Sequence, residues 1–149
     1  MSKRHHVFAL PVRVYFQDTD AGGVVYHASY VNFMERARTE WLRSFGYSNA
    51  GLMKELGVVF VVRSLKLDYL RPALLDDMLS VTAQVKELGC SRLSLLQSVL
   101  RGDELLCMRK RFLRSAEIRG GCECHRECGA CRRDVICLQI DLHQRLGQF

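Results

Sequence analysis

The spacing of apolar side chains changes along the chain, and each change predicts a different element. Apolar and polar residues alternate from Val12 to Phe16, which is the two-residue period of a half-buried strand. From Tyr30 to about Phe45 the apolar residues recur at helical spacing, with Ser29 in position to be the N-cap and Gly46 to end the helix. The pattern predicts a strand, a loop and then a long amphipathic helix.

The rest of the pattern predicts a short helix followed by strands. Ser48 to about Leu56 has helical spacing and is ended by Gly57. Beyond it the period shortens, and strands are expected within residues 58–70, 79–88, 92–100 and from 105 onward. One strand, two helices and then strands joined by tight turns predict an α+β fold, in which an antiparallel β-sheet wraps around the long central helix.

Length and composition set the class of protein. The chain has 149 residues, 48% of them apolar, which favours a single domain with a substantial core. No apolar run reaches the roughly eighteen residues that a membrane-spanning helix needs. The apolar patch from Val7 to Leu10 is too short for a secretory signal, so we expect a cytoplasmic protein with reduced thiols.

Composition changes toward the C-terminus. Residues 107–149 hold six of the seven cysteines, neither proline, and most of the net charge of +6. The excess of basic residues therefore gives no indication of nucleic-acid binding by the larger part of the chain. We expect a main domain over residues 1–107, whose last strand can extend to about 118, and an atypical basic, Cys-rich tail over residues 119–149.

The loop before the long helix carries the residues best suited to chemistry. It reads Asp18-Thr19-Asp20-Ala21-Gly22-Gly23-Val24-Val25-Tyr26-His27. A carboxylate close to a helix N-terminus lies beside unpaired backbone N–H groups and the positive end of the helix dipole. This combination suits attack on a carbonyl whose oxygen gathers negative charge. On the residues alone, however, an Asp-x-Asp before two glycines is more often a turn or capping device.

The loop belongs to a longer pattern. It consists of Val12-Arg13-Val14-Tyr15-Phe16-Gln17-Asp18-Thr19-Asp20-Ala21-Gly22-Gly23-Val24-Val25-Tyr26-His27-Ala28-Ser29-Tyr30, then Glu35-Arg36-Ala37-Arg38-Thr39-Glu40, and later Leu75-Asp76-Asp77. Over residues 10–107 the chain resembles the hotdog-fold acyl-CoA thioesterases of the 4-hydroxybenzoyl-CoA thioesterase type, most closely the YbgC-like branch associated with Tol–Pal genes. The resemblance implies a hotdog fold, thioester hydrolysis, and a homo-oligomer, dimer or tetramer, with active sites between subunits. It implies no cofactor, metal, nucleic acid or transmembrane segment.

The resemblance also implies which residues form the site. Asp20 and His27 are expected to be catalytic, and Gly22, Gly23, Val24 and Tyr26 to bind substrate. The neighbouring carboxylate of Asp18 is expected to be a structural hydrogen-bond acceptor that holds the loop.

Thioester hydrolysis needs a nucleophile and a stabilised oxyanion, because the thiolate leaves with little acid assistance. Asp20 either attacks the acyl carbon directly, giving a mixed anhydride, or acts as the base that activates water. Backbone N–H groups at the glycine pair and near His27 would polarise the carbonyl oxygen. His27 contributes through its ring or through its backbone N–H, and the sequence leaves both open.

Two departures from the family keep other functions open. Phe16 and Gln17 stand where the family has Tyr and Glu, so the phenol at that position is lost. After Cys107 the family's valine-rich ending is replaced by Arg109-Lys110-Arg111 and then cysteines, as either a shifted reading frame or real divergence would produce. The first alternative function is a hotdog domain that binds acyl thioesters without hydrolysing them.

The second alternative is a zinc-binding tail. Cys128-x-x-Cys131, together with Cys124 or His125, has the ligand types of structural zinc. The cluster lacks the second, well-separated pair of ligands that makes a strong zinc motif, so a loosely packed tail is favoured over a metal site. If zinc were bound, the basic tail would suit a protein partner or nucleic acid.

Overall fold

The structure, a computed structural model, describes residues 7–109, except 57, 61, 63, 90 and 91, and residues 116–118. The first half holds β1 (Phe8–Arg13), a 3-10 turn η1 (Phe16–Asp18), α1 (His27–Ser44), α2 (Asn49–Leu56), β2 (Val58–Phe60) and β3 (Leu67–Tyr69). The second holds β4 (Met78–Gly89), β5 (Arg92–Arg101), β6 (Glu104–Arg109) and β7 (Ala116–Ile118). The predicted α+β class is confirmed.

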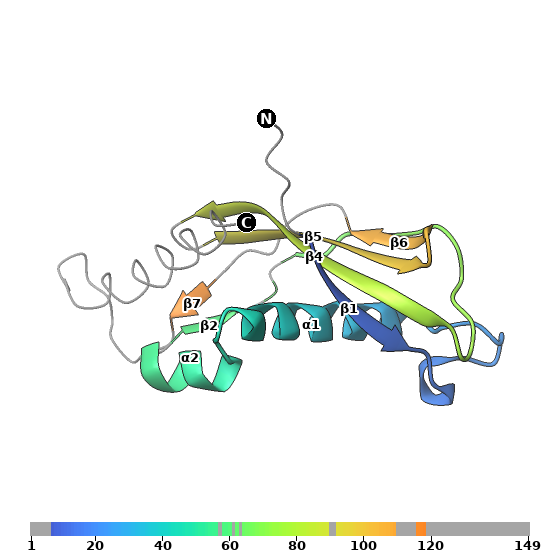
Figure 1. Ribbon diagram of the computed structural model, residues 1–149, viewed down its shortest axis with the longest axis horizontal. Helices are drawn as coiled ribbons and strands as arrows, with labels where there is room; N and C mark the ends of the chain where they lie inside the picture. Colours follow the sequence, from blue (N-terminus) through green and yellow to red (C-terminus); the bar gives the residue numbers. More distant parts are fainter. Residues whose placement is uncertain are drawn as a thin grey trace.

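The main sheet is antiparallel and has five strands in the order β1-β4-β5-β6-β3. The long helix α1 runs along one face of this sheet, with β1 crossing in front of it (Figure 1). This is the expected hotdog arrangement, a sheet wrapped around a central helix. The strands β2 and β7 form a separate two-stranded antiparallel pair and do not join the main sheet.

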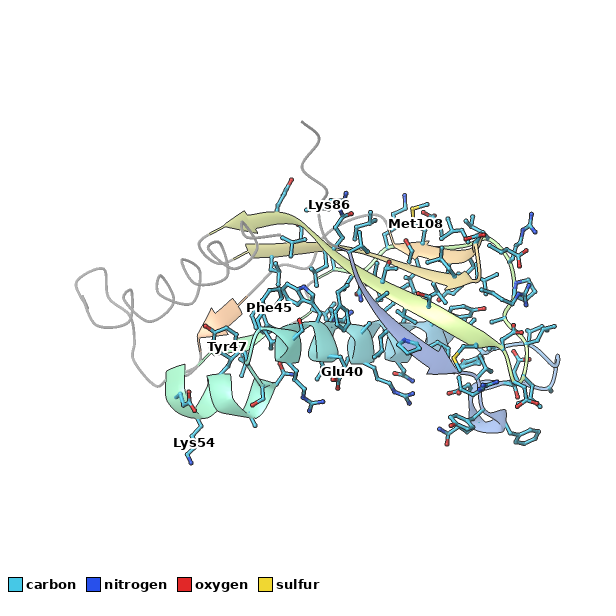
Figure 2. The ribbon with its side chains drawn as sticks, in the orientation of Figure 1. Glu40, Phe45, Tyr47, Lys54, Lys86 and Met108 are labelled. Carbon is cyan, nitrogen blue, oxygen red and sulfur yellow. The ribbon has the colours of Figure 1, made fainter. Side chains whose placement is uncertain are left out.

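The core lies between α1 and the sheet. Phe33, Met34 and Ala37 on α1 are fully buried against a cluster that includes Val81 and Val99 of the central strands. A second cluster forms around Trp41 at the C-terminal end of α1. Phe45 and Tyr47 pack against that cluster, and Figure 2 shows both between the helices and the sheet, whereas Glu40 points to the opposite side of α1. The predicted apolar stripe of the helix is therefore its buried face.

One polar pair interrupts this apolar interface. Gln97 of β5 is fully buried, and its side-chain nitrogen donates a hydrogen bond to the backbone oxygen of Met34, 2.9 Å away. Its side-chain oxygen accepts a hydrogen bond from Arg38 at 3.0 Å. Burial lowers the pKa of the Arg38 guanidinium, an effect that nearby Glu35 opposes. The amide thus ties α1 to the sheet at a fixed position along the helix axis.

The predicted bounds of the first strand and the predicted start of the long helix are wrong. The first strand runs from Phe8 to Arg13 rather than from Val12 to Phe16. It ends at Arg13 because residues 16–18 form the 3-10 turn and the Asp18 carboxylate accepts a hydrogen bond from the backbone N–H of Tyr15. Helix α1 begins at His27 with Tyr26 as N-cap, about one turn before the expected start at Tyr30 with Ser29 as N-cap. No described helix is long and apolar enough to cross a membrane.

Candidate active site

The loop between β1 and α1 folds as a tight hairpin, which we call the acidic turn (residues 18–26). Asp20 N donates to Val24 O at 3.0 Å, and Tyr26 N donates to Asp18 O at 2.8 Å. Thr19 and Val25 face each other as an isolated antiparallel bridge. These bonds close the turn on itself, so its tip projects as a unit immediately before the helix.

The Asp20 carboxylate lies exposed at the tip of this turn. Its Oδ1 atom accepts a hydrogen bond from Gly22 N at 2.8 Å. Its Oδ2 atom has no hydrogen-bond partner among the described residues, so one oxygen is oriented by the turn and the other can reach a ligand. The turn therefore restricts the side chain without occupying both of its oxygens.

The two glycines serve different purposes. A Cβ atom on Gly22 would lie 3.0 Å from the Oδ1 atom of Asp20, closer than side chains normally approach. Gly23 has φ +77°, a left-handed conformation that costs other residues roughly 1–2 kcal/mol. Gly22 thus leaves room for the carboxylate, and Gly23 permits the bend.

The structure confirms a structural role for Asp18. This residue is buried, and its Oδ2 atom accepts a hydrogen bond from Tyr15 N at 2.9 Å. Its backbone oxygen also accepts a hydrogen bond from the hydroxyl of buried Ser29, at 3.1 Å. Ser29, predicted as a helix cap, instead fastens the first turn of α1 to the base of the acidic turn.

The N-terminus of α1 has no side-chain cap. Tyr26 provides no capping hydrogen bond, and Ser29 N donates only to the Tyr26 carbonyl, at 2.9 Å. The backbone N–H groups of His27 and Ala28 therefore lack acceptors within the described part of the chain. Uncapped amides at a helix N-terminus favour negative charge, so this end of α1 can stabilise an oxyanion.

The His27 side chain is exposed and lies among aromatic rings. Its ring centroid is 4.3 Å from that of Tyr26 and 6.4 Å from that of Tyr69, the latter in an edge-to-face arrangement. The Tyr69 hydroxyl donates a hydrogen bond to the backbone oxygen of His27, 2.9 Å away. This bond from β3 fixes the first residue of α1.

A second segment, residues 70–77, backs the acidic turn. The sequence pattern included its residues 75–77 but did not place the segment against the turn. Val25 N donates to Ala73 O at 2.9 Å, and Val24 forms a bridge with Leu74. Ala73 N in turn donates to the hydroxyl of buried Tyr30, also at 2.9 Å. A tyrosine in an apolar helical stripe is the one available signal, because a buried hydroxyl needs a partner.

All six residues expected at the site belong to this turn or to the helix start that follows it. The exposed ones are Asp20, Gly22, Gly23, Tyr26 and His27, and Val24 is half-buried against the backing segment. The hairpin and the helix start thus place a carboxylate and unpaired amides on one connected unit.

Other candidate chemistry is not found within the described residues. They hold no cluster of three or more metal-ligating side chains. Cys107 is a free thiol in the core, and burial, with a further contribution from Asp68, raises its pKa to about 11, so it stays protonated at neutral pH. The cysteines and histidine of the alternative zinc site, within residues 122–131, lie outside the described residues.

Comparison with known proteins gives one consistent result. Residues 22–108 match the family model described as "Thioesterase superfamily". The acyl-CoA thioester hydrolase YbgC of Escherichia coli O6:H1 is 49% identical over 100 residues, which is 67% of this chain and 74% of that protein. The acyl-CoA thioesterase YbgC of Haemophilus influenzae is 46% identical over 99 residues, 66% of this chain and 73% of that protein.

A solved structure supports the fold. The crystal structure of a protein described as a probable thioesterase from Bartonella henselae is 36% identical in sequence to this chain. The two superpose with a TM-score of 0.68 over 70% of this chain and 86% of the other.

Proposed function

The chain belongs to the thioesterase superfamily, and we propose that its reaction is centred on the Asp20 carboxylate. The protein is an acyl-CoA thioesterase, which hydrolyses the thioester of acyl-coenzyme A to the free acid and coenzyme A. The observation that supports Asp20 is its position: an exposed carboxylate, oriented through one oxygen, on a turn that leads directly into an uncapped helix N-terminus.

Asp20 supplies the oxygen that starts the reaction. Either Oδ2 attacks the acyl carbon and expels the thiolate, leaving a mixed anhydride that water then hydrolyses, or the carboxylate accepts a proton from an attacking water. The hydrogen bond from Gly22 N restricts the side chain to a narrow range of positions, which reduces the entropy lost on reaching the transition state.

The start of α1 supplies the oxyanion stabilisation. Negative charge develops on the carbonyl oxygen as the acyl carbon becomes tetrahedral. The unpaired N–H groups of His27 and Ala28 and the positive end of the helix are suited to that charge. One such donor is worth about 2.7–4 kcal/mol of barrier. Gly22, Gly23, Val24 and Tyr26 line the approach of the substrate, with the glycines allowing a close backbone contact.

The enzyme works as a homo-oligomer whose active sites lie between subunits. Large apolar side chains are exposed around the acidic turn and the segment that backs it: Tyr15, Phe16, Tyr26, Leu74, Leu75 and Met78. Several large exposed apolar side chains near one site favour its burial against another surface. A second copy of the chain packed here would bury these side chains and close the acyl pocket over Asp20.

We infer that the protein is cytoplasmic and, from the resemblance to the YbgC-like branch, that it is associated with Tol–Pal. The free Cys107 thiol is compatible with a reducing compartment, although its burial would protect it elsewhere too. Sedimentation velocity of the purified protein distinguishes a dimer from a tetramer.

Hydrolysis of a panel of acyl-CoA esters tests the function. The panel contains short-chain, aromatic and long-chain acyl groups, and the released thiol and the bound ester are measured separately. Turnover of at least one class is expected, with a rate that also identifies the acyl preference. Binding without hydrolysis of any ester would favour the alternative, a protein that binds acyl thioesters without hydrolysing them. Phe16, which stands where the family has Tyr, is the sequence feature behind that alternative.

A further inference from the structure

The acidic turn rests against residues 70–77, which we call the support segment. Figure 1 shows this connection between β3 and β4 descending to the loop between β1 and α1. The hydrogen bond from Val25 N to Ala73 O and the bridge between Val24 and Leu74 join the two. Whatever fixes the support segment therefore also fixes one side of the turn that carries Asp20.

Both ends of the support segment are held by one group of charges, the ion-pair cluster (Arg71, Asp77, Arg101 and Glu104). Arg101 donates from one guanidinium nitrogen to Asp77 Oδ2 and from another to Glu104 Oε2, both at 2.7 Å. Arg71 donates to the other oxygen of Glu104 at 2.5 Å. The cluster thus ties the two ends of the segment to the hairpin between β5 and β6.

Asp77 links this cluster to the backbone of the segment. The same Oδ2 atom that binds Arg101 also accepts a hydrogen bond from Leu74 N at 2.8 Å. Leu74 is the residue that forms the bridge with Val24 of the acidic turn. A short path therefore runs from Arg101 through Asp77 and Leu74 to the acidic turn, with a hydrogen bond or strand bridge at each step.

We propose that the ion-pair cluster is a positioning device for thioester hydrolysis. Arg101 and Asp77 hold the support segment, and through it the acidic turn, where the Asp20 carboxylate can reach the acyl carbon. This inference rests on the proposed role of Asp20. A displacement of about 1 Å in a reacting group can lower the rate by about a hundredfold, which is why a remote anchor can control turnover.

The geometry separates this cluster from an ordinary surface ion pair. Isolated exposed pairs contribute little, and Arg43 with Glu40 on α1 is such a pair, formed within one helix. Arg101 instead joins segments distant in sequence, and its carboxylate partner Asp77 is only 19% exposed. The cluster is therefore expected to restrict relative motion of two parts of the fold.

Kinetics of Arg101→Gln against Arg43→Gln test the proposal. The Arg101 variant is expected to lose about tenfold or more in kcat, with a smaller change in KM, because substrate contacts remain while the carboxylate is misplaced. Arg101→Lys, which can hold one carboxylate at a time, should recover part of the loss. The Arg43 variant removes an equal charge and should leave kcat unchanged. Equal kcat values for the two Gln variants would overturn the proposal.

Amide hydrogen exchange supplies a readout that does not depend on catalysis. In Arg101→Gln the amides of Val25 and Ala73 should exchange faster, whereas that of Ala37 in the centre of α1 should not. Unchanged exchange at Val25 and Ala73 would refute the positioning role. If the Arg101 variant fails to fold, the same measurements are made on Asp77→Asn. Its amide oxygen can still accept the hydrogen bond from Leu74 N. Absence of turnover in the unaltered chain would refute the proposed function but not the structural part of this proposal. Amide exchange at Val25 and Ala73 would still show whether the ion-pair cluster holds the acidic turn.

Discussion

At the scale of single residues, two aspartates of the acidic turn look alike in sequence but have different environments. Asp18 is buried and holds the turn through its side chain and backbone oxygens, whereas Asp20 is exposed and held through one oxygen. The difference arises because Tyr15 N and the Ser29 hydroxyl reach only Asp18. Two carboxylates two positions apart can therefore take a structural and a chemical role.

Gly22→Ala is expected to lower turnover about tenfold with little change in stability. The added Cβ atom would lie 3.0 Å from the Asp20 Oδ1 atom, so the carboxylate must move. The measurements are kcat and the free energy of unfolding in urea. Gly51→Ala in helix α2 is the matched control. Its added Cβ would also lie close to a side-chain oxygen, the Ser48 hydroxyl at 2.9 Å, but outside the acidic turn. Undiminished turnover of the Gly22 variant would show that the carboxylate position is unimportant.

His27→Ala is expected to reduce kcat by less than about tenfold, because the backbone N–H at the helix start survives the change. The removed ring contacts Tyr26 and Tyr69 and forms no described hydrogen bond to Asp20. Steady-state kinetics with the best ester of the panel would provide the comparison. A loss of about a hundredfold or more would assign the chemical role to the imidazole ring instead.

Much of this residue-level pattern could be predicted, but only where it is local. The glycine pair and the role of Asp18 follow from turn chemistry within ten residues of sequence. The hydrogen bond from Ala73 N to the Tyr30 hydroxyl joins residues 43 positions apart. Nothing in the spacing around Tyr30 specifies that partner, so the support segment could be found only in the folded chain.

At the scale of elements, the sequence identified helices and strands better than their ends. The apolar stripe of α1 and the alternation of apolar and polar residues in β4 are long periodic signals. They arise because the two elements bury their apolar side chains in the same core cluster. The start of α1 depends on local competition instead. Ser29 is a common cap residue, but its hydroxyl binds the Asp18 backbone, and the helix extends back to His27 without a side-chain cap.

The ion-pair cluster should make stability depend on acid pH. Burial opposes ionisation of Asp77, but the Leu74 amide and Arg101 outweigh it and lower the pKa. Hydrogen bonds from Arg101 and Arg71 likewise lower the pKa of Glu104. Carboxyl groups with a lowered folded-state pKa add stability above their unfolded values, about 4, and lose it as the pH falls through the folded values.

Urea unfolding of the unaltered chain and Arg101→Gln, from about pH 7 to pH 2, tests this linkage. The unaltered chain should be the more stable at neutral pH, and the difference should shrink as the carboxyl groups become protonated. Arg43→Gln, which removes an exposed pair within one helix, should show a smaller difference throughout. If the difference in free energy of unfolding between the unaltered chain and Arg101→Gln stayed constant down to the lowest pH, the ion-pair cluster would not be the source of the pH dependence.

At the scale of the whole molecule, the fold could be predicted because its elements follow in a diagnostic order. One strand, a long helix and then antiparallel strands produce the sheet β1-β4-β5-β6-β3 against α1. The family match ends at residue 108, one residue before β6 ends at Arg109. Residues 119–149 lie outside both that match and the described structure, so the predicted tail stays a prediction.

Phe16→Glu is expected to weaken both association and turnover. Phe16 is 82% exposed next to the acidic turn, and a charge there would oppose burial against a second subunit. Sedimentation velocity and kcat should change together. Met53→Glu, at a side chain 47% exposed on α2, should change neither. Retained association and full turnover in the Phe16 variant would place the subunit contact elsewhere.

The most direct measurement of the central claim is the turnover of Asp20→Asn. The Asn side-chain oxygen can still accept the hydrogen bond from Gly22 N, so the turn, the unfolding transition and acyl-CoA binding should be retained. Glu55→Gln, which removes an exposed carboxylate on α2, should keep full activity. We predict that kcat of the Asp20 variant falls by at least about a hundredfold. A folded Asp20→Asn protein that keeps about a tenth or more of the original kcat would contradict the account.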